Sequence, residues 1–351
     1  MTATRIVIGA GGTAGHVVPA LAVADALRAE GAEVVFVGGD RAERELVPAA
    51  GYELHTLRAA PLPRGRPVQA ARAGLVAAGA LREAMRVVGQ VRPAAILGAG
   101  GYVAGPVGLS AVLSRIALVL SEADSHLGLT NRLLAPFARR VCLAFPIDGR
   151  DGGRYLVTGR PVPRPATDWR AARARFGIDA RESCVLVFGG SQGARSINQA
   201  AVEAFAGARF HVLHAAGERD LPDLQAPGPH YDLRGYLPDF GEAILACDLV
   251  VARAGGSIFE IAAHGKPAVL VPYPYATADH QTANARFMER AGAAVVIPDA
   301  ELTPARLANE VGRLLSDRGR LTAMARASAA LARPNAARDI AHEVLAAARG
   351  R

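Results

Sequence analysis

The stretch IVIGAGGTAGHVVPALAVADAL, Ile6 to Leu27, decides the fold. It starts as a short apolar strand, passes through a glycine-rich turn and continues with the spacing of a helix. The stretch CVLVFGGSQGARSINQAA, Cys184 to Ala201, repeats this arrangement about half a chain later. Two such units predict an α/β protein with two parallel-sheet domains that face each other across a ligand cleft.

The rest of the chain supports two domains. A length of 351 residues exceeds one ordinary core. The proline-rich segment Gly159 to Pro165 stops regular structure and indicates a linker. We therefore expect an N-terminal domain over 1–160, a C-terminal domain over 161–334, and a final amphipathic helix over 335–351 that packs on either domain. The apolar strands expected in the two domains are Ile6–Ile8, Glu33–Val37, Ala95–Leu97, Ala117–Leu120, Tyr155–Thr158, Cys184–Phe188, Phe210–His214, Leu249–Ala252, Ala268–Val271 and Ala294–Ile297.

Composition excludes several classes of protein. The net charge is +8, but the basic residues are dispersed and aromatic residues make up only 5%, which argues against a nucleic-acid partner. No stretch approaches the roughly 18 apolar residues that span a bilayer, and the N-terminus lacks the features of a signal peptide. Cys142, Cys184 and Cys247 have no paired spacing, so we expect reduced thiols and a cytoplasmic protein.

The first glycine turn, Gly9 to His16, can direct backbone N–H groups at an anion. It also matches the dinucleotide pattern G-x-G-x-x-A, with Asp40 after the second strand, so a nicotinamide-dependent oxidoreductase is an alternative. His16 follows the turn where a substrate would approach. It is a candidate site residue, although most isolated histidines near the start of a helix are capping or solvated groups.

Three later segments carry groups suited to a nucleotide sugar. Phe188 to Asn198 is a glycine turn that lacks the Lys-Ser/Thr of a Walker loop and could bind a diphosphate. Glu260 can accept hydrogen bonds from both hydroxyls of a ribose, or it is a plain helix-dipole acid. Asp279 to Asn284 gathers carboxylate, imidazole and amide groups that suit sugar hydroxyls.

Six ordered motifs together resemble the MurG family over nearly the whole chain. They are GGTAGH at 11–16, GAGGYVAGP at 98–106, LTNRLLA at 129–135, GGSQGAR at 189–195, RAGGSIFE at 253–260 and DHQTANA at 279–285. The resemblance implies a GT-B fold of two Rossmann-like domains. It also implies inverting transfer of N-acetylglucosamine (GlcNAc) from UDP-GlcNAc to the C4 hydroxyl of N-acetylmuramic acid in lipid I, which yields lipid II for peptidoglycan. UDP-GlcNAc would be a substrate, and no metal or other cofactor is expected.

The resemblance also implies roles for individual residues. His16 would be the catalytic base. The acceptor diphosphate would be bound at Gly11, Gly12, Gly100, Gly101 and Tyr102. The donor would be bound by Thr13, Ala14, Gly15, Asp124, Arg160, Arg164, Ser191, Gln192, Gly193, Leu237, Gly255, Gly256, Ser257, Ile258, Glu260 and Gln281.

The chain departs from the family pattern at two of these places. Ser121, Glu122, Ala123 and Asp124 stand where the family usually has His-Glu-Gln-Asn. Gly159 to Pro163 replaces Gly-Asn-Pro-Val-Arg, so either Arg160 or Arg164 would contact the donor. These changes leave open a divergent transferase of the same fold with another lipid or metabolite acceptor. A UDP-sugar sensor without activity is a further alternative.

A lipid acceptor would require contact with the cytoplasmic face of the cell membrane. The apolar residues Leu75, Val76, Leu81, Met85 and Val88 lie in a segment that also carries arginines. An apolar face with a basic rim suits peripheral docking on anionic lipid, although a helix packed on its own sheet gives the same pattern. The arginines are Arg64, Arg66, Arg72, Arg82 and Arg86.

Overall fold

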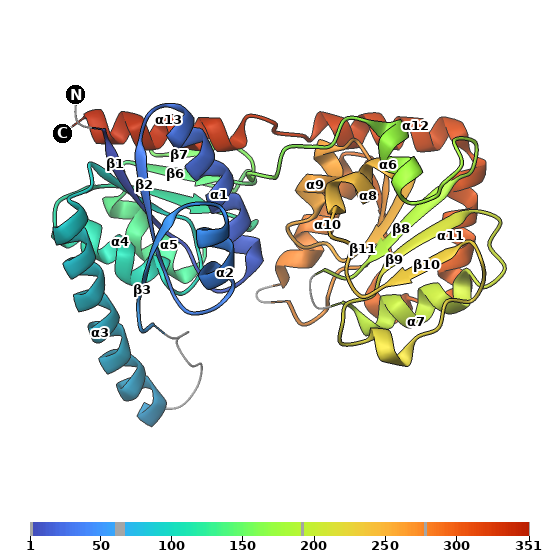
Figure 1. Cartoon of the computed structure of the whole chain (residues 1–351), viewed down its shortest axis with the longest axis horizontal. Helices are drawn as coiled ribbons and strands as arrows, with labels where there is room; N and C mark the ends of the chain where they lie inside the picture. Colours follow the sequence, from blue (N-terminus) through green and yellow to red (C-terminus); the bar gives the residue numbers. More distant parts are fainter. Residues whose placement is uncertain (1–2, 60–66, 191–192, 277–278, 351) are drawn as a thin grey trace. The chain divides into compact units, whose positions relative to one another are not determined.

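The computed structural model describes residues 3–59, 67–190, 193–276 and 279–350, with the backbone alone for 67–75. The chain forms two compact units (Figure 1). Unit 1 comprises Met1–Pro163 together with Arg333–Arg351, and unit 2 comprises Arg164–Ala332. The division between 163 and 164 falls inside the proline-rich segment.

Unit 1 contains a seven-stranded sheet in the order β3-β2-β1-β4-β5-β6-β7, and each neighbouring pair is parallel. Its strands are β1 (Arg5–Gly9), β2 (Glu33–Gly38), β3 (Glu53–Thr56), β4 (Ala95–Gly98), β5 (Ala117–Glu122), β6 (Arg140–Leu143) and β7 (Tyr155–Val157). Its helices are α1 (Ala14–Ala29), α2 (Ala42–Ala49), α3 (Pro67–Val91), α4 (Ala104–Leu113), α5 (Leu129–Leu134), the 3₁₀ helix η1 (Ala135–Phe137) and α13 (Ala336–Arg349).

Unit 2 contains a six-stranded parallel sheet in the order β10-β9-β8-β11-β12-β13. Its strands are β8 (Cys184–Phe188), β9 (His211–Ala215), β10 (Tyr231–Arg234), β11 (Leu249–Ala252), β12 (Ala268–Leu270) and β13 (Ala294–Val296). Its helices are α6 (Trp169–Arg175), α7 (Arg195–Ala204), η2 (Leu221–Asp223), α8 (Phe240–Ala246), α9 (Ile258–Ala263), α10 (His280–Arg290), η4 (Asp299–Glu301), α11 (Pro304–Ser316) and α12 (Arg318–Ala330).

The apolar strands are buried on both faces. In β1, Ile6 and Ile8 pack in one core cluster with α1 and α13, whereas Val7 packs in the other with α3 and α4. Because helices cover both faces of the sheet, the strand is continuously apolar instead of alternating. The three cysteines are buried free thiols, as predicted. Among the described residues, no helix combines the length and the apolarity needed to span a bilayer.

In both sheets the strand order reverses next to the first strand of the unit. The reversal lies between β1 and β4 in unit 1 and between β8 and β11 in unit 2. Ligands of open parallel sheets bind beyond the carboxyl ends of the strands at this switch point. The glycine turns that follow β1, β4, β8 and β11 lie at these two switch points, and they are the turns that we predicted from the sequence to bind ligands.

Pro19 is the sixth residue of α1 and lies beyond its first turn. One prediction about a helix needs correction. On α3, Val88 is 3% exposed and belongs to the core, so its assignment to a membrane face was wrong. Val76 and Met85 are 41% and 42% exposed, as such a face requires. The side chains of Leu75 and Arg72, and all of Arg64 and Arg66, lie outside the described residues.

Candidate active site

The glycine turns after β1 and β4 pack backbone against backbone. Gly101 has φ +79°, and a Cβ at this position would lie 1.8 Å from the carbonyl oxygen of Gly11. Gly100 has φ +98°, and its Cβ would lie 2.8 Å from Nδ1 of His16. Both positions therefore demand glycine for its conformation and for its lack of a side chain. The close approach brings the predicted acceptor glycines and the predicted base into one place.

A buried carboxylate that the sequence analysis did not identify fastens these turns. Glu43 on α2 is 0% exposed. Its Oε2 accepts a hydrogen bond from the Gly12 N–H at 2.9 Å, and its Oε1 accepts one from the Gly39 N–H at 2.7 Å. The hydroxyl of Tyr102 lies 3.5 Å from Oε1. The only sequence signal is an acid early in an otherwise ordinary surface helix, which does not distinguish this role from a helix-dipole charge.

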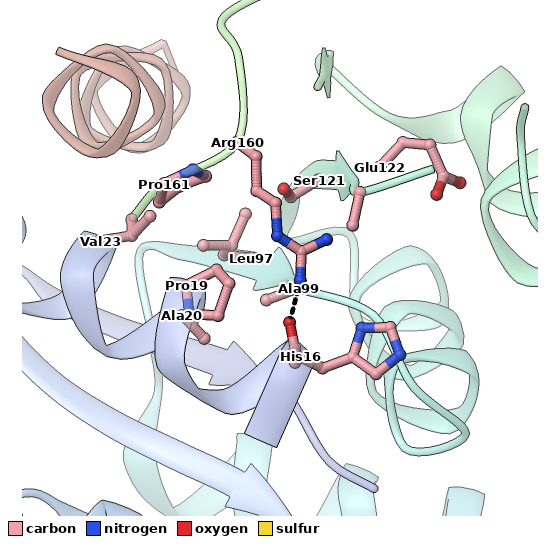
Figure 2. Close-up of a pocket in the computed structure, with 12 residues that line it drawn as sticks. His16, Pro19, Ala20, Val23, Leu97, Ala99, Ser121, Glu122, Arg160 and Pro161 are labelled. Atoms are coloured by element: carbon pink, nitrogen blue, oxygen red, sulfur yellow. Dashed lines mark hydrogen bonds between the residues drawn. The ribbon is translucent and has the colours of Figure 1, made fainter. Parts of the chain in front are cut away.

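His16 and Arg160 line a pocket at the start of α1, together with Leu97, Ser121 and Glu122 (Figure 2). Figure 2 shows the Arg160 guanidinium directed at the first turn of the helix, where it donates a hydrogen bond to the carbonyl oxygen of Gly15. Pro19 explains why that oxygen can accept: residue 19 has no N–H to close the helical bond to residue 15.

Arg160 is thus the arginine that the structure places beside His16. Arg164 is exposed and belongs to unit 2. Thr13 precedes α1, and Ala14 and Gly15 begin its first turn. Of these three predicted donor contacts, Gly15 lines the pocket.

The surroundings of His16 keep its imidazole neutral. Burial lowers the pKa of His16 from its ordinary value of 6.5, and the positive charge of Arg160 lowers it further. The negative charges of Asp124 and Glu43 act in the opposite direction. Nδ1 is buried without a hydrogen-bond partner among the described residues. A neutral imidazole has a free lone pair at pH 7, as a general base requires.

Glu122 shapes the loop that carries Asp124. Its carboxylate accepts hydrogen bonds from the N–H groups of Asp124 at 3.1 Å and Gly128 at 2.8 Å, and from Nδ2 of Asn131 at 2.9 Å. Burial raises the pKa of Glu122, while these hydrogen bonds oppose the rise. The family glutamate at this position therefore acts as an anchor for the loop, and Ser121 and Ala123 on either side of it line the pocket.

In unit 2 the turn after β8 is as tightly packed as those of unit 1. Gly193 has φ +74°, and its Cβ would lie 2.0 Å from the carbonyl oxygen of Ala216. Ser191 and Gln192 lie outside the described residues. The turn leads into α7, whose first N–H groups have no partner within the helix itself.

The turn after β11 brings Gly255, Gly256 and Ser257 to the start of α9, with Ile258 and Glu260 in its first turn. Arg253 precedes this turn and was not among the predicted site residues. It is 7% exposed and donates hydrogen bonds to Asp299 Oδ1 at 2.5 Å and to Ser196 Oγ at 2.8 Å. This buried arginine ties the β11 turn to α7. Leu237 is buried, so only its backbone is available to a ligand.

Gln281 and Asn284 on α10 lie against the same turn. Gln281 Oε1 accepts a hydrogen bond from the Tyr273 N–H at 3.0 Å, and its Nε2 lies near Gly255. Asn284 is 2% exposed and donates from Nδ2 to the carbonyl oxygen of Ala254 at 3.0 Å. The amide of Gln281 is therefore oriented by the backbone, and the structure brings it together with the predicted Gly255 and Gly256.

This architecture is that of a glycosyltransferase of two parallel-sheet domains. Residues 6–143 match the glycosyltransferase family 28 N-terminal domain and residues 184–344 match the C-terminal domain. A UDP-N-acetylglucosamine--N-acetylmuramyl-(pentapeptide) pyrophosphoryl-undecaprenol N-acetylglucosamine transferase of Nitrosococcus oceani is 42% identical over 99% of this chain and 100% of its own length. The transferase of the same name from Halothermothrix orenii is 35% identical over 94% of this chain and 95% of its own.

The chain therefore belongs to this family of transferases, the MurG family. A crystal structure of Acinetobacter baumannii MurG superposes with a TM-score of 0.78 at 29% identity and covers 98% of this chain and 100% of its own. Both the family resemblance and the fold of two parallel-sheet domains predicted from the sequence are confirmed. The family assignment favours a glycosyltransferase over a nicotinamide-dependent oxidoreductase.

Proposed function

We propose that the chain transfers GlcNAc from UDP-GlcNAc to the C4 hydroxyl of N-acetylmuramic acid in lipid I, and so forms lipid II for peptidoglycan synthesis. The names of its relatives support both substrates. The observation that carries the proposal is the pair of glycine turns at each switch point. Those of unit 1 meet at a neutral histidine. In unit 2 the turn after β11 lies near Gln281 and leads into the helix that carries Glu260.

The reaction is a single displacement at the anomeric carbon of GlcNAc. His16 takes the proton of the acceptor hydroxyl, whose oxygen forms a bond to C1 as the bond from C1 to the UDP oxygen breaks. UDP leaves with the bonding electrons, and the anomeric configuration inverts. Proton removal by a positioned base contributes about 100-fold to 10,000-fold to such a step.

The donor is bound by unit 2 in this proposal. The N–H groups at the starts of α7 and α9 hold the diphosphate, and the backbone of Leu237 contacts uracil. Glu260 accepts hydrogen bonds from the ribose hydroxyls, and Gln281 contacts the GlcNAc hydroxyls. Helix N-termini and arginine stabilise the negative charge that develops on the leaving diphosphate, so we expect the transfer to need no metal ion.

Peripheral contact with the membrane belongs to the same proposal. The neighbouring elements α3, α4, α5 and η1 each expose large apolar side chains. Exposed arginines lie among them, including Arg82, Arg86 and Arg132. Apolar side chains beside cations bind an anionic lipid surface, which would be the cytoplasmic leaflet that contains lipid I. The apolar residues are Val76, Met85, Leu109, Leu113, Leu129, Leu133 and Phe137.

Transfer is tested with radiolabelled UDP-GlcNAc and a lipid I analogue. We expect a β-linked disaccharide product and release of UDP, both strongly reduced in His16→Ala. UDP-galactose serves as the control donor. Hydrolysis of UDP-GlcNAc without a disaccharide, or wild-type turnover by His16→Ala, would refute the assignment of substrate or base respectively.

One observation favours a second candidate acceptor. Ser121 and Ala123 line the pocket beside His16 and replace the larger family residues His and Gln. A pocket altered at two positions suits a related lipid-linked or metabolite alcohol. The two candidate acceptors are distinguished by measuring kcat/KM for lipid I and for a panel of such alcohols in competition. The acceptor with the higher kcat/KM is the one that the pocket selects.

A further inference from the structure

Two histidines and a glutamate converge at the edge of the unit 2 sheet opposite the donor turns. His211 is the first residue of β9, and His230 comes directly before β10. Glu182 lies two residues before β8, the neighbour of β9. All three residues therefore occupy the amino-terminal ends of adjacent parallel strands, whereas the glycine turns follow the carboxyl ends. The transfer chemistry does not use this edge.

Their side chains form a compact set of donor atoms. Nδ1 of His230 lies 3.1 Å from Oε1 of Glu182, and Nδ1 of His211 lies 3.9 Å from Oε2 of the same carboxylate. One ligand atom from each residue falls within 4.8 Å of the others. A zinc ion binds nitrogen and oxygen ligands at about 2.0–2.2 Å, which places neighbouring ligands about 3–3.5 Å apart. Small rotations of the side chains would close this set around an ion.

The backbone holds the three residues in place. The N–H of His211 donates to the carbonyl oxygen of Ser183 at 2.8 Å, and the N–H of Val212 donates to the carbonyl oxygen of His230 at 2.8 Å. The carbonyl oxygen of Glu182 accepts a hydrogen bond from the buried Arg173. Ligands fixed by strand pairing and a buried cation need little ordering when an ion binds.

The imidazole of His211 lacks the partners that a buried polar group normally has. Its side chain is 12% exposed. Nε2 is buried with no hydrogen-bond partner among the described residues, and the 3.9 Å from Nδ1 to Glu182 is too long for a hydrogen bond. Buried polar atoms without partners are rare. Nδ1 is the nitrogen that faces Glu182, and because it makes no hydrogen bond to that carboxylate it is available to an ion.

We propose that Glu182, His211 and His230 bind one zinc ion. Two imidazoles and one carboxylate are a known zinc ligand set, with water in the fourth position. The 61% exposure of the His230 side chain gives the ion access to solvent. The ion joins the starts of β8, β9 and β10 and stabilises the edge of the donor-binding unit without taking part in transfer.

The full-length protein is dialysed against a chelator and titrated with Zn²⁺ by calorimetry. We expect one ion per chain and a rise in Tm on binding. Titration with Co²⁺ should give the visible absorption of a tetrahedral nitrogen and oxygen site. Because His230 is exposed, His230→Ala should fold normally, and Glu182→Gln keeps the size of the side chain. Each variant should weaken binding by at least about tenfold.

His342→Ala is the matched control, because His342 is an exposed histidine on α13 of unit 1. It should bind Zn²⁺ like the wild type. Binding that is absent in the wild type, or unchanged in both His230→Ala and Glu182→Gln, would overturn the proposal. Equal loss in the control would do the same, since it would indicate binding at scattered histidines.

Discussion

His16 is buried between charges of opposite sign, and its burial together with those charges sets the pH at which it can act as a base. Burial and Arg160 favour the neutral imidazole, and Asp124 and Glu43 favour the protonated one. The base form is present above the lowered pKa and is lost as the pH falls through it. Activity should therefore decline only below pH 6.5, the ordinary value for histidine.

Arg160→Gln should move this acidic limb to higher pH, because it removes the cation that lowers the pKa of His16. Asp124→Asn should move it to lower pH for the converse reason. The measurement is kcat/KM against pH for the three proteins. Arg160 also donates a hydrogen bond to the first turn of α1, so its replacement can lower kcat/KM at every pH. The test therefore compares the pH at which kcat/KM falls and not the maximum value of kcat/KM. Limbs that coincide in all three proteins would remove His16 from the role of base.

Glu43 offers a second test at the scale of one side chain. Glu43→Gln replaces one acceptor oxygen with an NH₂ group that faces a backbone N–H of Gly12 or Gly39. An unsatisfied buried group of this kind costs about 1–3 kcal/mol of stability. Displacement of the Gly11–Gly12 turn should raise KM for the acceptor and leave the affinity for UDP unchanged. Glu45→Gln, an exposed position on the same helix, is the control. An acceptor KM equal to the wild-type value would leave Glu43 with a structural role alone.

At the scale of elements, a buried polar network joins α7 to β9 and β10. His214 is 0% exposed, with Nδ1 2.7 Å from the Tyr231 hydroxyl and Nε2 3.0 Å from Oδ1 of Asn198. Asn198 Nδ2 donates to the carbonyl oxygen of Ala216, which also contacts Gly193. The network thereby links the sheet to the turn that is proposed to bind the diphosphate.

Burial lowers the pKa of His214 to about 4. The unfolded chain takes up the proton near pH 6.5 and the folded chain near pH 4, so stability is fully present above pH 6.5 and is lost as the pH falls toward 4. The loss is about 3 kcal/mol over that interval. Urea unfolding at pH 7.5 and pH 4.5 should show most of this difference in the wild type and a smaller one in His214→Gln. His342→Ala, which changes an exposed histidine, should behave like the wild type.

The surface formed by α3, α4, α5 and η1 gives a prediction for membrane contact. Met85→Glu and Leu113→Glu should each weaken sedimentation with vesicles of anionic phospholipid by about tenfold, because a charge replaces an apolar side chain worth about 1.5–3 kcal/mol on burial. Leu156→Glu alters a comparably exposed residue on β7 and should bind like the wild type. Equal binding by all four proteins would place the membrane contact elsewhere.

The sequence predicted most of the continuously apolar strands, but it did not predict the short strands of mixed polarity. Continuous apolar runs such as Val185 to Phe188 are confirmed as strands because both faces of each sheet are covered. The strands β3 and β10 were not predicted, since Glu53–Thr56 and Tyr231–Arg234 mix polar with apolar residues. The strand β6 was also missed, although its residues Val141, Cys142 and Leu143 are buried, because its apolar run is only three residues long. On α3, residues of the core and of the surface alternate at helical spacing, so the pattern alone could not assign Val88.

Within the site, glycine turns were predictable because the required conformation restricts the residue type. Glu43 and Arg253 were not, because their roles depend on partners far away in the sequence. Gly12 is 31 residues from Glu43, and Asp299 is 46 residues from Arg253. Pro19 is the sequence feature that distinguishes Arg160 from Arg164. Because Pro19 has no N–H, the carbonyl oxygen of Gly15 has no helical donor and accepts a hydrogen bond from Arg160. The roles predicted for the donor-binding and acceptor-binding residues stay predictions.

At the scale of the whole molecule, unit 1 is made of two separate pieces of chain. α13 packs against α1, and Ile340, Ala341, Val344 and Leu345 complete the core that contains Ile6 and Ile8. Gly159 lies next to Arg333, where the chain returns to unit 1. The last helix is thus a part of the N-terminal core.

Residues 1–163 alone should fail to fold cooperatively. Loss of α13 exposes several buried aliphatic side chains at about 1.5–3 kcal/mol each, which is comparable to the whole stability of a domain. Joining 333–351 to residue 163 through a short glycine-serine linker should restore a single thermal transition. Circular dichroism and calorimetry measure this. Cooperative unfolding of 1–163 without α13 would contradict the assignment of the helix to this core.

This two-piece construction affects how the protein is made. Residues 1–163 are synthesised long before Ala336, so the first piece of unit 1 lacks one of the helices that cover this face of its sheet until α13 has been made. All of unit 2, Arg164–Ala332, is synthesised before α13. The core of the N-terminal unit is therefore completed only after the whole of unit 2 has been made, in contrast to the usual order in which the N-terminal domain folds first during translation. Until α13 emerges, the nascent chain lacks the residues that complete the core around Ile6 and Ile8, and these side chains are accessible to a chaperone at the exit of the tunnel.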